Sequence, residues 1–282
     1  MNKADEYFKE NYKNIIENGY KDELPRPKYL DGTPAYTYSV NQITRKYDLS
    51  KGEYPIMTLR PQAWKSAIKE ILWIFQDQSN DLTMLHDKYN IKYWDDWDIG
   101  DGTIGTRYGK TISTHYNITE FVSNIKKDPF GRRHIIDLWQ VDDFRTPGLK
   151  PCAFLTMWNV RKSKDGLYYI DMTLVQRSGD MCAASGAGGI NEIQYCALML
   201  MICKCTDFLP GVFCHFIQNE QIYDRHLENA KTMSERDSIY QPILTLDTGN
   251  TDFYNFTISD FNIDGYDKIK NYNHQLKFDL GV

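Results

Sequence analysis

The feature that most constrains the fold is a long helix predicted over residues 191–205, because its side chains are apolar nearly all round. A helix with one apolar stripe can lie on a surface, whereas a helix that is apolar on every side must be covered on every side. A chain of 282 residues is long enough to bury such an element. We therefore expect residues 191–205 to form the buried core helix.

Hydrophobic periodicity predicts the remaining elements. The predicted helices cover residues 3–18, 61–76, 79–88 and 121–127, and a further helix begins within 221–228. The predicted strands cover residues 36–40, 134–139, 212–218, 253–258 and 275–279, with one more starting beside Cys152 and one ending near Gln176. The sequence contains no internal repeat, low-complexity segment or linker, so we expect residues 1–282 to form one domain.

Two stretches carry the candidate chemistry. Pro151-Cys152 stands at the beginning of an apolar, aromatic strand. Another strand ends on Gln176-Arg177-Ser178 with Asp180. A thiol becomes a good nucleophile when a nearby cation favours its thiolate. A cysteine with an Arg-Ser pair therefore suggests attack on a substrate that carries a phosphate. The alternative is a small buried cysteine beside a surface arginine, since free cysteines are commonly buried for packing.

Other polar residues have two open interpretations. Glu70 falls within the apolar pattern of helix 61–76, so its carboxylate either turns to solvent or lies at a pocket wall, where burial would raise its pKa. Arg26, between two prolines, is either a solvated charge or a phosphate clamp. Arg132 and Arg133 stand together at a turn, where paired arginines are usually solvated. The glycine-rich residues 182–189 precede a helix, which makes a generic anion site.

Composition excludes several classes of protein. The net charge of −5 lacks the positive excess that general nucleic-acid binding needs, so we expect no DNA partner. The six cysteines are irregularly clustered, unlike a secreted disulfide framework, and the spacing of Cys203, Cys205 and Cys214 does not suit a zinc pair. We expect no metal. No run reaches the ~18 apolar residues of a membrane span, so we expect a cytoplasmic protein without a membrane partner.

Taken together, these residues resemble the thymidylate synthase family from Asp31-Gly32-Thr33 to Val282. The resemblance rests on the order and spacing of several motifs rather than on any one of them. They are Trp64-Lys65 through Glu70-Ile71-Leu72-Trp73, Trp94-Asp95-Asp96-Trp97 through Tyr108-Gly109, Arg132-Arg133, and Pro151-Cys152 through Gln176-Arg177-Ser178, Asp180, Asn191 and Tyr223.

The resemblance implies an α+β fold, in which one domain holds a large mixed β-sheet packed by helices and two copies pair sheet to sheet. It implies reductive methylation of dUMP to dTMP, with 5,10-methylenetetrahydrofolate as carbon and hydride donor. Cys152 would attack C6 of the pyrimidine, which makes C5 a nucleophile. Arg132 and Arg133 would cross the interface of a homodimer to the phosphate held by the other copy.

The resemblance also assigns the remaining site residues. Arg177 and Ser178 would hold the phosphate, with Arg26 a possible helper, and Gln176 belongs to the substrate site. Asn191 would read the pyrimidine edge, Glu70 would manage protons, Tyr108 would lie near the C5 proton, and Tyr223 would bind the ribose. Asp180 would bind the pterin and Trp94 would pack on the folate, and the folate set also includes Arg60 and Val282.

Five departures from the family pattern bear on specificity. Gly32, Ala153 and Gly131 replace an arginine, a histidine and a serine that are usual in the family. Asn219 and Gln221 replace the common Asp and His before Tyr223, which affects sugar discrimination. The loop 182–189 is more glycine-rich than usual.

Two other functions stay open at this point. A pyrimidine-nucleotide hydroxymethylase would use the same Cys152 attack and the same folate, but water would capture the methylene group. Asn191 argues against cytosine as its base, where an Asp would be the better reader, but does not exclude dUMP. A non-catalytic nucleotide- or RNA-binding relative would not need Cys152, Glu70, Asn191 and Asp180 together.

Overall fold

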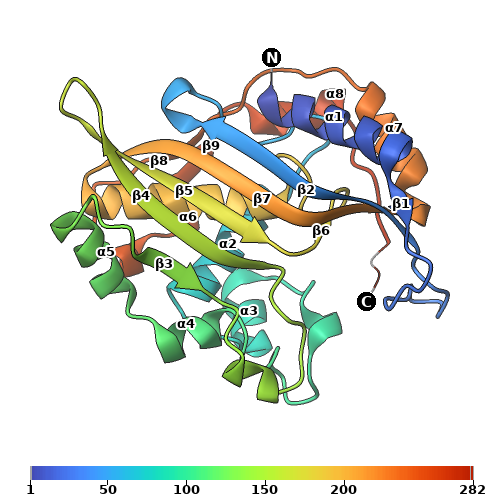
Figure 1. Cartoon of the computed structure of the whole chain (residues 1–282), viewed down its shortest axis with the longest axis horizontal. Coiled ribbons are helices and arrows are strands. Elements are labelled where there is room, and N and C mark those ends of the chain that lie inside the picture. The colour runs from blue at the N-terminus through green and yellow to red at the C-terminus, as the bar shows by residue number, and fades with distance from the viewer. Residues whose placement is uncertain (1, 280, 282) are drawn as a thin grey trace.

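A seven-stranded mixed β-sheet organises the chain, whose computed structural model describes residues 2–279 and 281 (Figure 1). Its strands lie in the order β1-β2-β7-β5-β4-β3, with β6 paired to β7. β7 runs parallel to β5 and β6, and the other neighbours are antiparallel. The strands are β1 (Tyr20–Lys21), β2 (Thr37–Asp48), β3 (His134–Asp137), β4 (Ala153–Lys162), β5 (Tyr168–Gln176), β6 (Gly179–Asp180) and β7 (Leu209–Tyr223).

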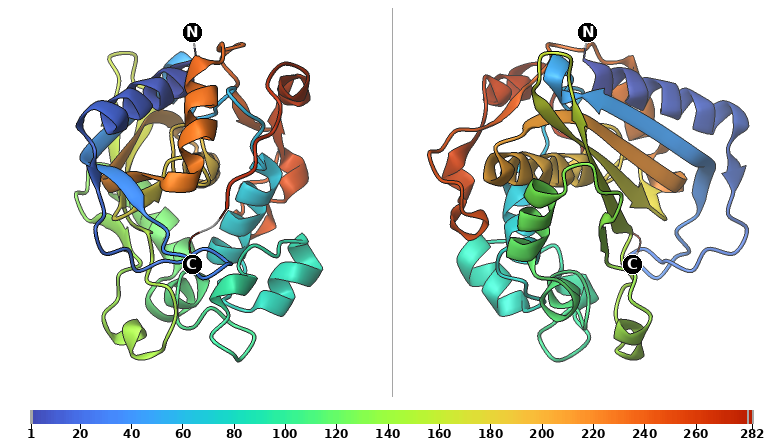
Figure 2. Two further views of the ribbon diagram at one scale, coloured as in Figure 1. Left: turned by 90° about the vertical axis from the view of Figure 1, so that its right-hand side faces the viewer. Right: turned by 60° about the vertical axis from the view of Figure 1, so that its left-hand side comes forward.

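The described α-helices lie against one face of this sheet and along its edges, as the left view of Figure 2 shows. They are α1 (Lys3–Asn18), α2 (Trp64–Phe75), α3 (Leu82–Tyr89), α4 (Gly109–His115), α5 (Ile118–Lys127), α6 (Ile190–Thr206), α7 (Leu227–Glu235) and α8 (Ile269–Tyr272). A small second sheet pairs β8 (Leu244–Leu246) with β9 (Phe261–Ile263). The mixed α+β architecture predicted from the sequence is confirmed.

α6 is the core helix that the sequence predicts. Its side chains from Glu192 to Cys203 are all buried. It lies behind β5 and β7 in Figure 1 and packs against α2 and α5. Trp158, Met172 and Phe213 point from the sheet into the same core. This helix, which is apolar nearly all round, is therefore covered on every side.

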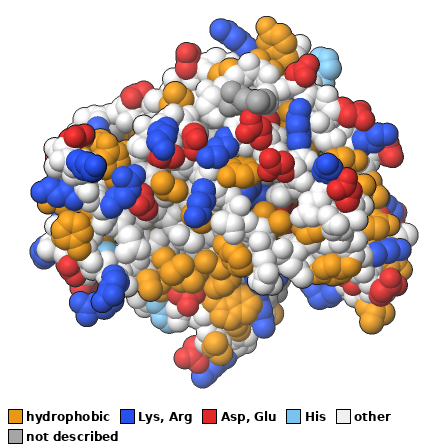
Figure 3. Space-filling model, turned by 45° about the horizontal axis from the view of Figure 1, so that its top comes forward, with side chains coloured by type: hydrophobic (Ala, Val, Ile, Leu, Met, Phe, Trp, Pro, Cys, Tyr) orange, Lys and Arg blue, Asp and Glu red, His pale blue; other side chains and the backbone are white. Residues whose placement is uncertain are grey.

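The opposite face of the sheet carries apolar side chains that no described helix covers. Ile135 is 42% exposed and stands directly across from Met157, while Leu155, Val175 and Phe216 form a half-buried row over β4, β5 and β7. Figure 3 shows hydrophobic side chains gathered in the lower centre of the molecule, below a region richer in charges. A contiguous apolar patch on a protein surface is typical of an interaction site.

Two sequence predictions are wrong, and one is confirmed late in its range. The helix predicted to begin within 221–228 begins only at Leu227, because β7 continues to Tyr223, where its backbone pairs with Thr37 of β2. Residues 253–258 and 275–279 are not strands. The first of these segments contains 3₁₀ turns, in which the Asp252 side chain accepts a hydrogen bond from the backbone N–H of Tyr254. Long-range pairing in one case and local capping in the other override the side-chain pattern.

The glycine-rich loop before α6 turns tightly against the rest of the chain. Gly188 has a φ of +68° and accepts a 3.1 Å hydrogen bond from the backbone N–H of Met57. A Cβ at this position would lie 2.2 Å from the nitrogen of Met57. Glycine is therefore required at position 188 both by backbone conformation and by space.

This requirement predicts that Gly188→Ala destabilises the protein by about 2–5 kcal/mol, the sum of left-handed strain and overpacking. Gly52→Ala is the matched control, since Gly52 has a φ of +78° but its Cβ would meet no described heavy atom within 4 Å. The control should lose about 1–2 kcal/mol. Urea unfolding of both variants measures the difference, and equal losses would refute the crowding at Gly188.

Candidate active site

The predicted site residues meet in one cavity of about 630 Å³ beside the beginning of α6. Strands β4, β6 and β7, helices α2 and α6, and several loops contribute to its wall. Ten of the predicted residues line it: Arg26, Glu70, Trp94, Tyr108, Cys152, Arg177, Ser178, Asp180, Asn191 and Tyr223. Residues remote in sequence thus converge on one concave site, which is the usual form of a small-molecule site.

The candidate nucleophile lies next to a cation. The Arg177 guanidinium donates to the carbonyls of Lys150 and Pro151, and its Nη2 lies 3.4 Å from the Cys152 sulfur. Burial raises the pKa of the Cys152 thiol, and the charges of Arg177 and Arg26 oppose this shift. The predicted thiol–cation contact is present, while the desolvated cavity itself favours the neutral thiol.

Glu70 lies at the pocket wall rather than in solvent. It is 6% exposed on α2 and accepts a short hydrogen bond from the Tyr93 hydroxyl. Burial raises the pKa of Glu70, against the effect of the bond from Tyr93. A carboxyl group with a raised pKa can hold and release a proton near neutral pH, which suits general acid–base chemistry.

Asn191 stands at the start of α6 with its amide fixed by neighbours. Its Oδ1 accepts from Ser185 Oγ at 2.7 Å and from Gln176 Nε2 at 3.3 Å, and its Nδ2 donates to Gln194 Oε1 at 3.0 Å. Gln176 itself is fully buried and does not line the cavity. It supports Asn191 from behind instead of facing a ligand.

Tyr108 and Trp94 form an aromatic wall near the nucleophile. The Tyr108 hydroxyl accepts a 3.1 Å hydrogen bond from the backbone N–H of Cys152, and burial raises the pKa of this phenol well above its usual value. The Trp94 ring packs edge to face on Tyr108, with 5.4 Å between ring centroids. The buried Trp94 Nε1 has no hydrogen-bond partner among the described residues. This wall offers a planar apolar surface with one unused donor.

Asp180 stabilises the loop that borders the cavity. Its Oδ1 accepts from the backbone N–H groups of Cys182 and Ala183 at 2.9 and 3.1 Å. In the described part of the chain, one group could hold a metal ion, formed by Asp180, Cys182 and His226. Burial raises the pKa of the Cys182 thiol well above its usual value, which disfavours the thiolate that a metal needs. We therefore assign no metal to this group.

Three predicted residues lie elsewhere, and a fourth is outside the described residues. Arg132 and Arg133 are exposed just before β3 and are not among the described residues that line the cavity. Arg60 is buried behind the cavity, where its Nη2 donates to the carbonyls of Cys182 and Ala183. Val282 lies outside the described residues. The folate roles of Arg60 and Val282 stay predictions.

The departures from the family pattern lie in different surroundings. Asn219 and Gln221 line the cavity next to Tyr223, and Ala153 is a small buried part of its wall. Gly32 is exposed at a turn, with a φ of +81°. The first two positions can therefore contact a ligand directly.

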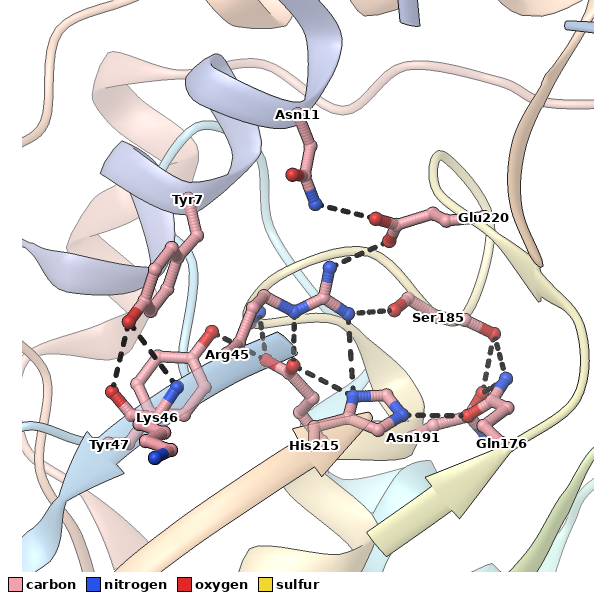
Figure 4. Close-up of polar contacts among 12 residues, drawn as sticks. Tyr7, Asn11, Arg45, Lys46, Tyr47, Gln176, Ser185, Asn191, His215 and Glu220 are labelled. Carbon is pink, nitrogen blue, oxygen red and sulfur yellow. Dashed lines mark hydrogen bonds and ion pairs between the residues drawn. The ribbon is translucent and has the colours of Figure 1, made fainter. Parts of the chain in front are cut away.

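Sequence reasoning missed the polar residues behind the cavity. Arg45, Glu192, His215 and Glu220 form a buried network that continues to Gln176 (Figure 4). The signal in the sequence was Glu192, a carboxylate near the start of a largely apolar helix. One of its oxygens accepts from the backbone N–H of Gly188 at 2.7 Å. The Glu192 carboxylate therefore occupies the anion site that the glycine-rich residues 182–189 predict.

Comparisons with known proteins point to one family. A family model described as thymidylate synthase matches residues 6–278. The chain is 48% identical to a thymidylate synthase of Streptococcus pneumoniae (strain 70585) over 286 residues, and 46% identical to one of Lactococcus lactis subsp. cremoris (strain SK11) over 285 residues. Both alignments cover 100% of each chain. The thermostable thymidylate synthase A of Bacillus subtilis matches the structure with a TM-score of 0.87 and 34% identity, over 99% of each chain.

Proposed function

The chain belongs to the thymidylate synthase family, and on that premise we propose how its own residues carry out the reaction. The protein is an enzyme that methylates dUMP to dTMP, as its full-length similarity to curated thymidylate synthases supports. The same similarity does not favour the hydroxymethylase, and it argues against a non-catalytic relative. The proposal takes residues 1–282 as one catalytic domain.

The observation that carries the proposal is the position of Cys152 beside Arg177 in the cavity that also holds Asn191. The Cys152 thiolate adds to C6 of the uracil ring, and the electrons of the C5–C6 double bond make C5 nucleophilic. A substrate phosphate at Arg177 and Ser178 directs the ring towards the sulfur. Arg26, exposed at the cavity mouth, adds positive charge to this position.

Asn191 reads the base. An amide can donate to O4 and accept from N3–H of uracil, whereas cytosine presents an acceptor at N3 and a donor at N4. The contacts of Asn191 with Ser185 and Gln194 fix which end of its amide is the donor. Tyr223 and Gln221, at the end of β7, border the space for the sugar.

Glu70 and Tyr108 manage protons on the two sides of the ring. The raised pKa of Glu70 lets it exchange a proton, through water, with O4 and with the co-substrate. The neutral phenol of Tyr108 lies against Cys152, where it orients the group that removes the C5 proton. Release of the Cys152 sulfur from C6 then restores the aromatic ring.

The family uses 5,10-methylenetetrahydrofolate as co-substrate, which supplies a one-carbon unit and a hydride when bound. The residues present fit such a group, because Trp94 offers an aromatic face and an unused buried N–H, and Asp180 offers a carboxylate at the same cavity. We assign Trp94 and Asp180 to hold the pterin. Asp180 would do so through the oxygen that does not accept from the loop backbone.

The uncovered face of the sheet supports the proposed homodimer. The half-buried row of Leu155, Val175 and Phe216 provides an apolar surface that a second copy would bury in a symmetric interface. Arg132 and Arg133 immediately precede β3 at the edge of this face, so they are free to reach the cavity of the other copy. Each active site would then combine residues of two chains.

The setting of the enzyme stays a prediction. No helix of the described residues is both long and apolar enough to cross a membrane. The net charge of −5 agrees with the expected absence of a DNA partner. We keep the cytoplasm as the expected location.

The covalent step predicts that Cys152→Ser abolishes turnover while dUMP still binds. A serine hydroxyl is far less ionised than a thiol, so addition to C6 fails although the phosphate site survives. Incubation with 5-fluoro-dUMP and the folate should trap an adduct on Cys152 of the unmodified enzyme, located by peptide mass spectrometry. An adduct on Cys182 or Cys196, or full activity of the serine variant, would refute the assignment.

The shared arginines predict complementation between two inactive variants. A Cys152→Ser chain mixed with an Arg132→Ala/Arg133→Ala chain should regain activity, because a heterodimer contains one site with an intact cysteine and intact arginines. At full subunit mixing, half of the dimers are heterodimers with one complete site each, so about a quarter of the unmodified activity should return.

The control for this experiment replaces the double variant with Arg145→Ala. Arg145 is exposed and pairs only with Asp142, so this chain should keep its own activity and show no rescue effect on mixing. Sedimentation of the unmodified protein as a monomer would contradict the shared site. So would the absence of rescue when subunit exchange is demonstrated.

A further inference from the structure

Behind the base-reading amide lies a set of charged residues that the reaction does not use directly. Arg45 on β2 is 1% exposed, and its guanidinium contacts Glu192 of α6 at 2.6 Å and Glu220 of β7 at 2.7 Å. His215 on β7 lies between Glu192 and Gln176, with no exposed surface (Figure 4). Three elements of the fold therefore meet in one buried network.

The direction of the hydrogen bonds in this network can be assigned from Gln176. Its Nε2 lies 2.8 Å from the carbonyl oxygen of Ser178, which can only accept, so this end of the amide is the nitrogen. Its Oε1 therefore faces Nε2 of His215, at 3.0 Å. An oxygen there requires that His215 Nε2 carries the proton.

The other ring nitrogen of His215 meets a carboxylate. Nδ1 lies 2.9 Å from Glu192 Oε1. Glu192 is ionised, because it also accepts from Arg45, Tyr47 and Gly188. Burial alone would raise the pKa of Glu192, but Arg45 and His215 lower it to about 2. Nδ1 also lies 3.4 Å from Arg45 Nη2, which can donate, so a neutral ring with its proton on Nε2 has a partner for its lone pair.

Charge balance agrees with a neutral His215 ring that carries its proton on Nε2. Two ionised carboxylates with Arg45 alone would leave a net negative charge in a fully buried place, which is costly. Burial raises the pKa of Glu220, against its contacts with Arg45 and Asn11. Burial also lowers the pKa of His215, against its hydrogen bond and attraction to Glu192. With Glu220 and His215 neutral, the charges of Arg45 and Glu192 balance.

The hydrogen bonds then run in one direction as far as the base reader. Gln176 Nε2 donates to Ser185 Oγ at 2.7 Å, so the Ser185 hydroxyl is left to donate to Asn191 Oδ1, also at 2.7 Å. Asn191 Nδ2 in turn donates to Gln194. Reversal of the Gln176 amide would reverse Ser185 and allow Asn191 to turn. A turned Asn191 amide would match cytosine instead of uracil.

We propose that His215, held between Glu192 and Gln176 with its proton on Nε2, is a positioning residue that fixes the Gln176 amide and, through Ser185, keeps Asn191 in its uracil-reading orientation. This inference rests on the proposed role of Asn191. It adds a specificity determinant that lies outside the cavity and touches no substrate.

Two variants of His215 test the proposal by substrate preference. His215→Leu removes the Nε2 donor, whereas the side chain of His215→Gln can place an N–H near the position of Nε2. For the leucine variant, the ratio of kcat/KM for dUMP to that for dCMP should fall about three- to tenfold, the effect of losing one oriented hydrogen bond. For the glutamine variant, this ratio should stay within about twofold of the unmodified value. His274→Leu, at an exposed histidine, is the control and should change nothing.

Asn191→Asp separates this inference from the proposed function. If that variant shifts preference towards dCMP while folded His215→Leu does not, Asn191 reads the base and the role of His215 is wrong. If Asn191→Asp leaves the preference unchanged, the proposed base reading itself fails. Equal losses of preference in the leucine and glutamine variants would also overturn the donor role of His215.

Nitrogen NMR of the unmodified, histidine-labelled enzyme tests the proton state without relying on a variant that folds. The chain has six histidines, and the spectrum of His215→Gln identifies the signals of His215 by their absence. Nε2 of His215 should be protonated at neutral pH. A lone pair on Nε2 would overturn the proposal.

Discussion

The ion pair of Arg45 with Glu192 is the interaction on which the site depends, because it joins the sheet to α6 at a fully buried place. Breaking a buried pair by removing one partner leaves an uncompensated charge and costs about 3–5 kcal/mol. The chain satisfies this requirement with Tyr47, the Gly188 backbone and His215, which all contact Glu192. The beginning of α6 is thereby held in one position against β7.

This constraint also bears on how the cavity can be specific. Asn191 directly precedes Glu192, so the residue proposed to read the base is joined in sequence to the residue that anchors the helix. The proposed nucleophile comes from a different part of the fold, where Arg177 fixes the backbone around Cys152. In this proposal, base recognition and nucleophilic attack rest on separate supports that converge on one cavity.

Local sequence patterns predicted the core helix and the pairing of Cys152 with Arg177, because each depends on side chains whose chemistry is visible in the sequence. The strand predicted over 212–218 extends further, to Tyr223, because its last residue pairs with Thr37, far away in the sequence. The supports behind the cavity were missed for the same reason: Arg45, Glu192 and His215 become one network only after three elements have packed. Folding, rather than local pattern, creates those contacts.

Analysis of both products made from dUMP and 5,10-methylenetetrahydrofolate tests the central claim most directly. Mass spectrometry identifies the nucleotide, and absorbance measures dihydrofolate in the same reaction. Reductive methylation predicts dTMP and dihydrofolate in equal amounts, because the folate supplies both the carbon and the hydride. 5-Hydroxymethyl-dUMP formed with tetrahydrofolate, or unchanged dUMP in the presence of folded enzyme, would contradict the account.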